Sequence, residues 1–166
     1  MSERNGTVVC PGTYDPVTLG HIDIITRTAN VFDKVVVGVV NNPLRKNKTL
    51  FSAEERKAFI ETATADLANV EVQIFSTLLV EFARENDAHA IVKGMRAISD
   101  FEYEFEMAQL NRKLDPGIES IYVIASPHYS FLSSTGVKEM ATFGGNVSDL
   151  VPASVATALA GRLGDR

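Results

Sequence analysis

The sequence contains a single cysteine, no tryptophan and no apolar run long enough to span a membrane. The lone Cys10 excludes an intrachain disulfide and is typical of a reducing compartment, so we expect a cytoplasmic location. Residues 1–6 are polar and lack the apolar core of a signal peptide. Acidic residues outnumber basic ones, 21 to 16, which gives a net charge of −5. This charge argues against binding to nucleic acid or to anionic membranes, so anionic ligands must be bound by local groups of Lys, Arg and backbone N–H.

Two common phosphate-binding patterns are also absent. The chain contains neither G-x-G-x-x-G nor G-x-x-x-x-G-K-[ST], which excludes a dinucleotide fingerprint and a P-loop as they are usually written. Any phosphate site must therefore have another geometry. No repeat or linker interrupts the chain, and 166 residues with 45% hydrophobic and 22% charged composition predict one soluble domain over residues 1–166.

Short β-branched runs alternate with helical segments along the whole chain. We predict strands at residues 7–10, 34–40, 70–75, 88–92 and 118–125, the first ending in a Pro-Gly turn. We predict helices at residues 20–31, 52–65, 77–86, 100–114, 133–142 and 152–163, with Pro152 at the first position of the last helix. This alternation predicts an α/β fold, a Rossmann-like doubly wound five-stranded parallel sheet with helices on both faces.

The predicted helix at residues 100–114 has more apolar width than one sheet face requires. One stripe comprises Phe101, Phe105 and Ala108, and the other comprises Tyr103, Met107, Leu110 and Leu114. Our hypothesis is that one stripe packs on the sheet and the other contacts a second subunit.

Three polar clusters follow predicted strands, at the edge of a parallel sheet where ligands bind. In the first cluster, a loop after residues 7–10 leads to Gly20 and His21 at the start of a helix, where backbone N–H groups and an imidazole suit a phosphoryl group. An ordinary β–α turn with a histidine near the cap fits these residues equally well. In the second cluster, Lys93 and Arg96 flank Gly94, which suits a phosphate, although two unrelated loop charges would look the same.

The third cluster, residues 129–138, places hydroxyl groups at a helix start, although a plain N-cap explains three hydroxyl residues as well. Lys138 lies one turn into that helix and either reaches the same pocket or faces water. Glu104 fits a solvated acidic face, and Arg45 and Lys46 fit a surface loop.

Three motifs together resemble the bacterial phosphopantetheine adenylyltransferases over nearly the whole chain. They are Pro-Gly-Thr-Tyr-Asp-Pro-Val-Thr-Leu-Gly-His at 11–21, Lys-Gly-Met-Arg at 93–96 with Asp-Phe-Glu-Tyr-Glu at 100–104, and Tyr-Ser-Phe-Leu-Ser-Ser-Thr at 129–135. The segment 18–21 resembles the T/H-x-G-H signature of the wider nucleotidyltransferase superfamily. The Ser-Ser-Thr at 133–135 with Lys138 resembles its second signature, with lysine at the arginine place.

The resemblance implies transfer of AMP from ATP to 4′-phosphopantetheine, giving dephospho-CoA and pyrophosphate in the penultimate step of coenzyme A synthesis. It implies Mg²⁺ with the ATP, a homohexamer, and no nucleic-acid or membrane partner. The catalytic residues that it implies are His21, Lys93 and Arg96. The ATP-binding residues that it implies are Thr13, Tyr14, His21, Gly94, Met95, Arg96, Glu104, Tyr129, Ser130, Phe131, Leu132, Ser133, Ser134 and Thr135. The phosphopantetheine-binding residues that it implies are Thr13, Leu79 and Lys93. The family's pantetheine-binding lysine corresponds to either Arg45 or Lys46 in this sequence.

A phosphate monoester with a second pKa of about 6 is largely ionised at pH 7, so the acceptor needs no general base. Positioning and preorganised donors then account for the reaction, with direct in-line attack. Two alternatives stay open at this point. One is a sister nucleotidyltransferase that uses CTP or a nicotinamide or glycerol phosphate acceptor. The other is a nucleotide-binding regulatory module on the same fold.

Overall fold

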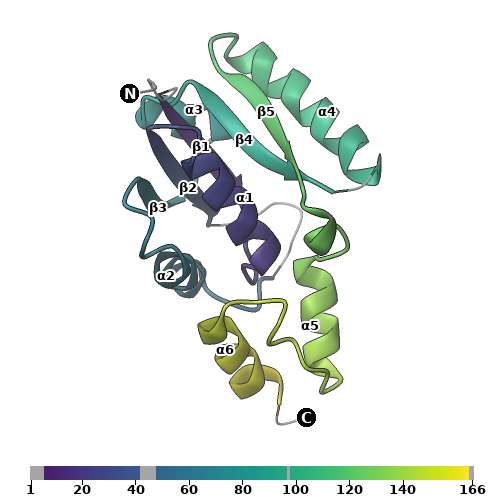
Figure 1. The fold of residues 1–166 in the computed structure, drawn as a ribbon. Helices are drawn as coiled ribbons and strands as arrows, with labels where there is room; N and C mark the ends of the chain where they lie inside the picture. The colour runs from purple at the N-terminus through teal and green to yellow at the C-terminus, as the bar shows by residue number, and fades with distance from the viewer. Residues whose placement is uncertain (1–5, 42–47, 97, 165–166) are drawn as a thin grey trace.

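The computed structural model describes residues 6–41, 48–96 and 98–164. Five strands form one sheet in the order β3-β2-β1-β4-β5, and all neighbouring strands are parallel (Figure 1). The strands are β1 (Thr7–Gly12), β2 (Lys34–Val40), β3 (Val70–Phe75), β4 (Ala90–Met95) and β5 (Glu119–Ile124). The helices are α1 (Leu19–Ala29), α2 (Ala53–Ala63), α3 (Leu79–Glu85), α4 (Ile98–Leu114), α5 (Ser134–Thr142) and α6 (Ala153–Leu163), with a 3₁₀ turn η1 (Pro127–Tyr129) before α5. The predicted doubly wound parallel fold is confirmed.

The central strands are apolar on both faces because helices cover both faces. Along β2, Val35, Val37 and Val39 belong to one buried cluster with residues of α1, α2, α5 and α6. Val36 belongs to a second cluster with residues of α3. Side chains alternate between the two faces of a strand, so a nearly continuous β-branched run fills both clusters. None of the helices in the described ranges is long and apolar enough to cross a membrane.

The strand order reverses between β1 and β4, and these two strands separate early. β1 pairs with β2 along its whole length, from Thr7 to Gly12. Its pairing with β4 covers only Val8 and Val9. Ligands of doubly wound sheets bind beyond the carboxyl ends of the strands at such a reversal. The separation of β1 from β4 therefore opens the sheet at the place where the three polar clusters were expected.

The predicted Pro-Gly turn after residue 10 is wrong, because Pro11 and Gly12 continue β1. Proline is normally excluded from central strands because it cannot donate a ladder hydrogen bond. Beyond Val9, however, β1 no longer pairs with β4 and is locally an edge strand, where proline is tolerated. A second correction concerns Pro152, which is the N-cap of α6 rather than its first helical residue.

β4 is also displaced from its predicted range of 88–92. It runs to Met95, so Lys93 and Gly94 lie in the strand, opposite Tyr122 and Val123 of β5. The interpretation of these residues as a solvated loop is therefore wrong. The backbone of this cluster is fixed by sheet hydrogen bonds rather than by a turn.

The two predicted stripes of α4 do not correspond to a buried and an exposed face. Phe101 and Phe105 of the first stripe are 51% and 55% exposed, and Leu110 and Leu114 of the second are 47% and 54% exposed. The buried or half-buried positions from Tyr103 to Asn111 include residues of both stripes. The division was wrong because the helix packs along a line between the stripes. Its apolar excess is nevertheless real and lies on the surface.

Candidate active site at the separation of β1 and β4

The histidine at the start of α1 belongs to a capping box. The side chain of Thr18 accepts a hydrogen bond from the backbone N–H of His21 at 3.3 Å, and the backbone N–H of Thr18 donates to Nδ1 of His21 at 3.0 Å. Because Nδ1 accepts this bond, the proton of the neutral ring is placed on Nε2. Tyr14 packs edge-on against the same ring, with centroids 5.0 Å apart. The cap therefore fixes both the tautomer and the direction of the imidazole.

Tyr14 supports the loop from inside the protein. Its side chain is 7% exposed, its hydroxyl donates to the carbonyl of Cys10 at 3.0 Å, and burial raises its pKa well above the ordinary value. Its φ of 52° lies in the left-handed region, which non-glycine residues rarely adopt. The ring thus anchors loop 13–18 in the core, and only the backbone of Tyr14 remains for contact with a ligand.

The carboxylate of Asp15 is fully buried beneath the same loop. It accepts hydrogen bonds from the backbone N–H groups of Leu50 and Phe51, each at 2.9 Å. Nζ of Lys138 on α5 lies 3.0 Å from its Oδ2. Lys138, whose side chain is 25% exposed, therefore reaches loop 13–18 of the candidate site rather than simply facing water. It compensates a charge that would otherwise be costly to bury.

Arg96 connects the end of β4 to the loop before α5. Its guanidinium donates to the carbonyl of Leu132 at 2.7 Å, and its Nε donates to Asp100 at 3.2 Å. The backbone N–H of Arg96 also donates to Asp100 at 3.2 Å. Asp100 lies in the first turn of α4, so Arg96 is aimed by a carboxylate on one side and a carbonyl on the other. Its side chain remains 40% exposed.

The start of α5 is tied to loop 13–18. Ser133 caps α5 by accepting from the N–H of Gly136 at 3.0 Å, as the plain N-cap interpretation predicted. The hydroxyl of Ser134, however, donates to the carbonyl of Pro16 at 2.8 Å. A Cβ added at Gly20 would lie 3.4 Å from Cβ of Tyr129, so the start of α1 also lies against the 3₁₀ turn that precedes α5. Through these contacts His21, Arg96 and Ser134 belong to one connected region.

Lys93 and Glu104 form an ion pair at 3.1 Å, and their side chains are only 20% and 15% exposed. Glu104 therefore does not lie on a solvated acidic face, as its neighbours in the sequence suggested. Its Oε2 is buried and makes no hydrogen bond of standard geometry within the described residues, so the Lys93 ammonium compensates its charge. At the next residue, a Cβ on Gly94 would meet Ile24 of α1 at 3.0 Å, so β4 lies close against α1 there.

The other predicted site residues are distributed around this region. Thr13 is half-buried and its carbonyl accepts a hydrogen bond from Arg56 at 2.7 Å. Leu79 is half-buried at the start of α3, and Met95 is half-buried at the end of β4. Phe131 is 72% exposed, whereas Leu132 is buried. Ser130 and Thr135 are exposed, and Tyr129 is half-buried. Arg45 and Lys46 lie outside the described residues.

Sequence reasoning missed three charged residues of the region, namely Asp15, Arg56 and Asp100. Asp15 lies inside a quoted motif, but nothing in the motif indicated that its carboxylate is buried. Arg56 follows two glutamates and resembles a surface charge, although its spacing of four residues from the buried Ile60 places it on the core face of α2. That spacing was the one available signal.

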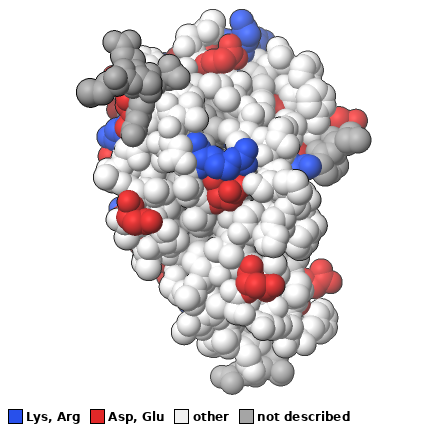
Figure 2. Space-filling view, in the orientation of Figure 1, with Lys and Arg blue, Asp and Glu red and all other residues white. Residues whose placement is uncertain are grey.

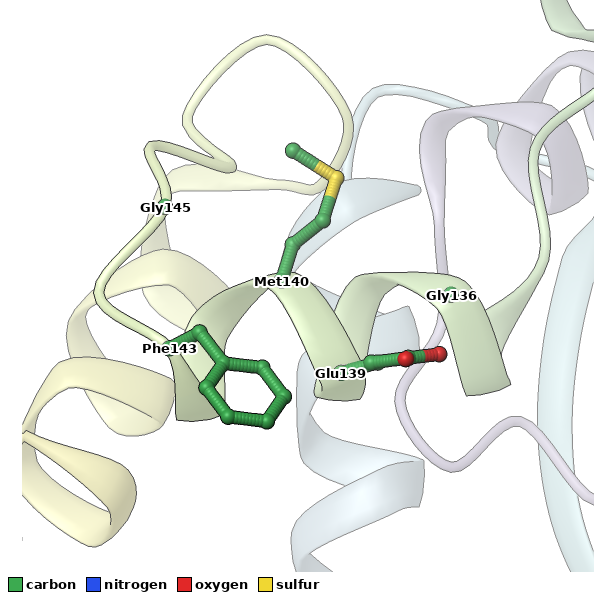
Figure 3. A pocket seen from close by; sticks show the side chains of 5 residues that line it. All are labelled: Gly136, Glu139, Met140, Phe143 and Gly145. Atoms are coloured by element: carbon green, nitrogen blue, oxygen red, sulfur yellow. The ribbon is translucent and has the colours of Figure 1, made fainter.

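Charge on the visible surface is sparse and mixed. In Figure 2 the Lys and Arg side chains on the face shown lie beside Asp and Glu side chains rather than forming a broad basic area. A separate hollow on α5 is lined by Gly136, Glu139, Met140, Phe143 and Gly145 (Figure 3). Its only ionisable side chain is a carboxylate, so this hollow does not suit a phosphate. The region beyond the carboxyl ends of β1 and β4, where doubly wound sheets have their ligand crevice, is the better candidate.

Known proteins resemble this chain over most of its length. The cytidylyltransferase-like family model matches residues 9–140, which include loop 13–18, Arg96 and the start of α5. The chain is 52% identical over 151 residues to a phosphopantetheine adenylyltransferase from Caldanaerobacter subterraneus, covering 91% of this chain and 93% of that protein. It is 54% identical over 144 residues to the protein of the same name from Rubrobacter xylanophilus, covering 87% of each. The chain also superposes on a solved structure from Vibrio parahaemolyticus, assigned as a nicotinate-nucleotide adenylyltransferase, with a TM-score of 0.66. The two chains are 15% identical, and the match covers 93% of this chain and 91% of that one. This likeness indicates a shared fold.

Proposed function

The chain belongs to the cytidylyltransferase-like family and, within it, to the phosphopantetheine adenylyltransferases, and from this we propose that its crevice joins the adenylyl group of ATP to the phosphate of 4′-phosphopantetheine. The products are dephospho-CoA and pyrophosphate, and the reaction is a step of coenzyme A synthesis. One observation supports the assignment of this reaction to the site. Ser134 connects the start of α5 to loop 13–18, and Arg96 connects the end of β4 to the segment before α5.

Two phosphorylated substrates must meet in this crevice, and its donors suit that task. We assign transition-state stabilisation to His21, whose Nε2–H is directed by the cap on Nδ1. Arg96 supplies a planar fork of donors and Lys93 a point charge. ATP binding is assigned to the region of Gly94, Met95 and Glu104 together with loop 129–135. Phosphopantetheine binding is assigned to Thr13, Leu79 and Lys93, with Arg45 or Lys46 as a further contact.

The proposed chemistry is a direct in-line displacement. An oxygen of the acceptor phosphate bonds to the α-phosphorus of ATP while the bond from that phosphorus to the bridging oxygen of pyrophosphate breaks. The acceptor is already ionised near pH 7, so the site needs no proton acceptor. The protein contributes orientation and charge stabilisation. Inversion of configuration at a chiral α-phosphorus is the expected result, and retention would require a covalent intermediate and overturn this mechanism.

Magnesium is proposed to enter with ATP. Mg²⁺ commonly keeps several waters and is held by substrate phosphates rather than by an all-protein cage. Within the described ranges no group of three or more His, Cys, Asp or Glu side chains is arranged to hold a metal ion. We therefore assign the ion to the phosphates and name no protein ligand for it. Its contribution would be neutralisation of the charge that develops on pyrophosphate.

A homohexamer in the cytoplasm completes the proposal. Self-association is supported by Phe101 and Phe105 on α4, whose stacked rings lie 5.9 Å apart, and by Leu110 and Leu114 on the same helix, since all four are about half exposed. Sedimentation at micromolar concentration measures it, and a monomer would contradict it. A reducing compartment agrees with the single, buried cysteine.

The decisive experiment measures pyrophosphate release from the purified protein. ATP and CTP are each combined with phosphopantetheine, nicotinate mononucleotide or glycerol 3-phosphate. We expect release with ATP and phosphopantetheine and background rates with the other five pairs. Faster release with CTP or with another acceptor would assign the chain to a sister reaction. ATP binding without release from any pair would indicate a regulatory module instead.

A further inference from the structure

Arg56 is a deeply buried charged side chain near the site, and the reaction proposed above gives it no role. Arg56 is the fourth residue of α2, and only 1% of its surface is exposed. A buried guanidinium is costly unless its donors are satisfied and its charge is compensated. Burial lowers the pKa of Arg56, and the negative charge of Asp15 opposes that shift. The protein therefore accommodates a charge here at a cost that an apolar side chain would avoid.

The donors of Arg56 reach carbonyl groups from three separate segments. Nη1 donates to the carbonyl of Thr13 at 2.7 Å and to that of Val40 at 2.9 Å. Nη2 donates to the carbonyl of Asn41 at 3.4 Å. Nε donates to Phe51 at 3.1 Å and to Ser52 at 3.3 Å. One side chain thus joins loop 13–18 after β1, the end of β2, and the segment that leads into α2.

The bond to Thr13 determines the orientation of a peptide group beside the crevice. The Thr13–Tyr14 peptide is trans, since the cis bond of this loop is the one between Asp15 and Pro16. In a planar trans peptide the carbonyl and the following N–H point in opposite directions. Because the Thr13 carbonyl points to the buried guanidinium, the N–H of Tyr14 points away from it. The hydroxyl of Tyr14, bonded to Cys10, holds the other side of the same residue.

The same side chain holds the chain where it leaves β2. Val40 is the last residue of β2, and Asn41 follows it directly. The next residues of the sequence lead to Arg45 and Lys46, to which the function proposed above assigns a contact with phosphopantetheine. Thr13 is assigned to the same substrate. One guanidinium therefore holds the backbone of Thr13 and that of Val40 and Asn41 at the end of β2.

We propose that Arg56 is a positioning residue for the acceptor substrate, which sets the relative placement of loop 13–18 and the end of β2 without touching either substrate. This proposal rests on the function proposed above. Arginine suits the role because its planar fork of five donors reaches several carbonyls at once. A lysine carries the same charge on one nitrogen and cannot span three segments.

The test compares Arg56→Lys with a matched variant, Ile60→Val, in steady-state assays of pyrophosphate release. Ile60 is fully buried and lies one turn further along α2, so Ile60→Val perturbs the same helix without removing a contact to the site. For Arg56→Lys we expect the KM for phosphopantetheine to rise about tenfold and the KM for ATP to rise less than about threefold, because a small displacement of positioning groups is costly. For Ile60→Val we expect both KM values to match the wild type.

A second variant tests the guanidinium itself. Arg56→Ala leaves a cavity that methylguanidinium at millimolar concentration fits, and we expect this ion to lower the KM for phosphopantetheine where methylammonium does not. If Arg56→Ala does not fold, the KM values of Arg56→Lys decide alone. Wild-type KM values in Arg56→Lys, with activity reduced only in proportion to the folded fraction, would overturn the positioning role. Absence of pyrophosphate release from the wild type would instead overturn the proposed function.

Discussion

The carboxylate of Asp15 and the ammonium of Lys138 meet at 3.0 Å although 123 residues separate them in the chain. Asp15 is fully buried in loop 13–18, and Lys138 reaches it from α5. The pair therefore links the first loop of the domain to one of its last helices. Together with the two backbone N–H bonds to Asp15, it ties loop 13–18 both to α5 and to the segment before α2.

Replacement of Asp15 by Asn is expected to lower the free energy of unfolding by about 3 kcal/mol, because it leaves the Lys138 ammonium without its buried partner. Urea denaturation measures the change. Lys138→Met combined with Asp15→Asn is expected to recover part of the loss, since both charges are then removed. The exposed Asp149→Asn serves as the control and is expected to change stability by less than about 0.5 kcal/mol.

Replacement of His21 by Ala is expected to lower kcat by about 10²- to 10³-fold, the usual loss for one transition-state donor. Loss of the capping box with Thr18 also lowers stability, by about 1 kcal/mol, so the assay is run well below the melting temperature. The exposed His89, which lies at the opposite end of β4, gives the control variant His89→Ala with wild-type kcat. A raised KM with kcat intact would remove His21 from the catalytic role.

Removal of the Lys93 ammonium in Lys93→Met is expected to raise the KM for phosphopantetheine about tenfold, and more than the KM for ATP, because one charge-assisted contact to the acceptor phosphate is lost. Initial-rate kinetics with each substrate varied in turn measures both constants. Lys34→Met removes a surface ion pair with Glu71 at the other edge of the sheet and is expected to leave both unchanged. A larger rise for ATP would reassign Lys93 to the nucleotide.

Gly38 in β2 has no room for a side chain. A Cβ there would lie 2.5 Å from a ring carbon of Phe82 and 3.0 Å from one of Phe75, and these two rings are stacked with centroids 4.3 Å apart. Gly38→Ala is expected to destabilise the protein by about 3 kcal/mol in thermal or chemical denaturation, because the rings must separate. Gly161→Ala in α6 meets nothing within 4 Å and is expected to stabilise by about 0.5–1 kcal/mol. Equal effects of the two substitutions would contradict this.

Burial raises the pKa of the Cys10 thiol to about 12, whereas the pKa of a cysteine in the unfolded chain is about 8.5. The unfolded state therefore loses a proton that the folded state keeps, and this contribution to stability is present below pH 8.5 and declines as the pH rises toward 12. Between pH 8 and 9.5 the decline amounts to about 1 kcal/mol. Denaturation of the wild type and of Cys10→Ala across this range measures it, and the variant is expected to lack this part of the pH dependence.

The parallel sheet and its covering helices were predictable from the sequence because they follow local patterns. Residues 34–40 are β-branched almost without interruption, and β2 occupies that range. Ser52 and Glu55 form the capping box that their spacing indicates. Parallel strands bring their carboxyl ends to one edge, so the clusters after β1, β4 and β5 were expected at the same edge, and the strand order makes these three strands neighbours.

The structural features that the sequence did not reveal depend on contacts between residues that are distant in the chain. Pro11 stays in β1 because β4 has already separated from it, and no property of the segment 7–12 indicates that separation. Arg56 and Asp15 are buried because carbonyl and N–H groups from other segments satisfy them. A charged residue is ordinarily exposed, so the partners that allow these two to be buried are seen only in the three-dimensional contacts.

Three of the links between the site segments end on main-chain oxygens. Ser134 donates to the carbonyl of Pro16, Arg96 to that of Leu132, and Arg56 to that of Thr13. Every amino acid offers the same oxygen, so mutation at many of the accepting positions would leave the framework intact. A lineage carrying this framework could exchange the residues that select an acceptor or a nucleobase while the spacing of the segments stays the same, which would let new specificities arise on one inherited architecture.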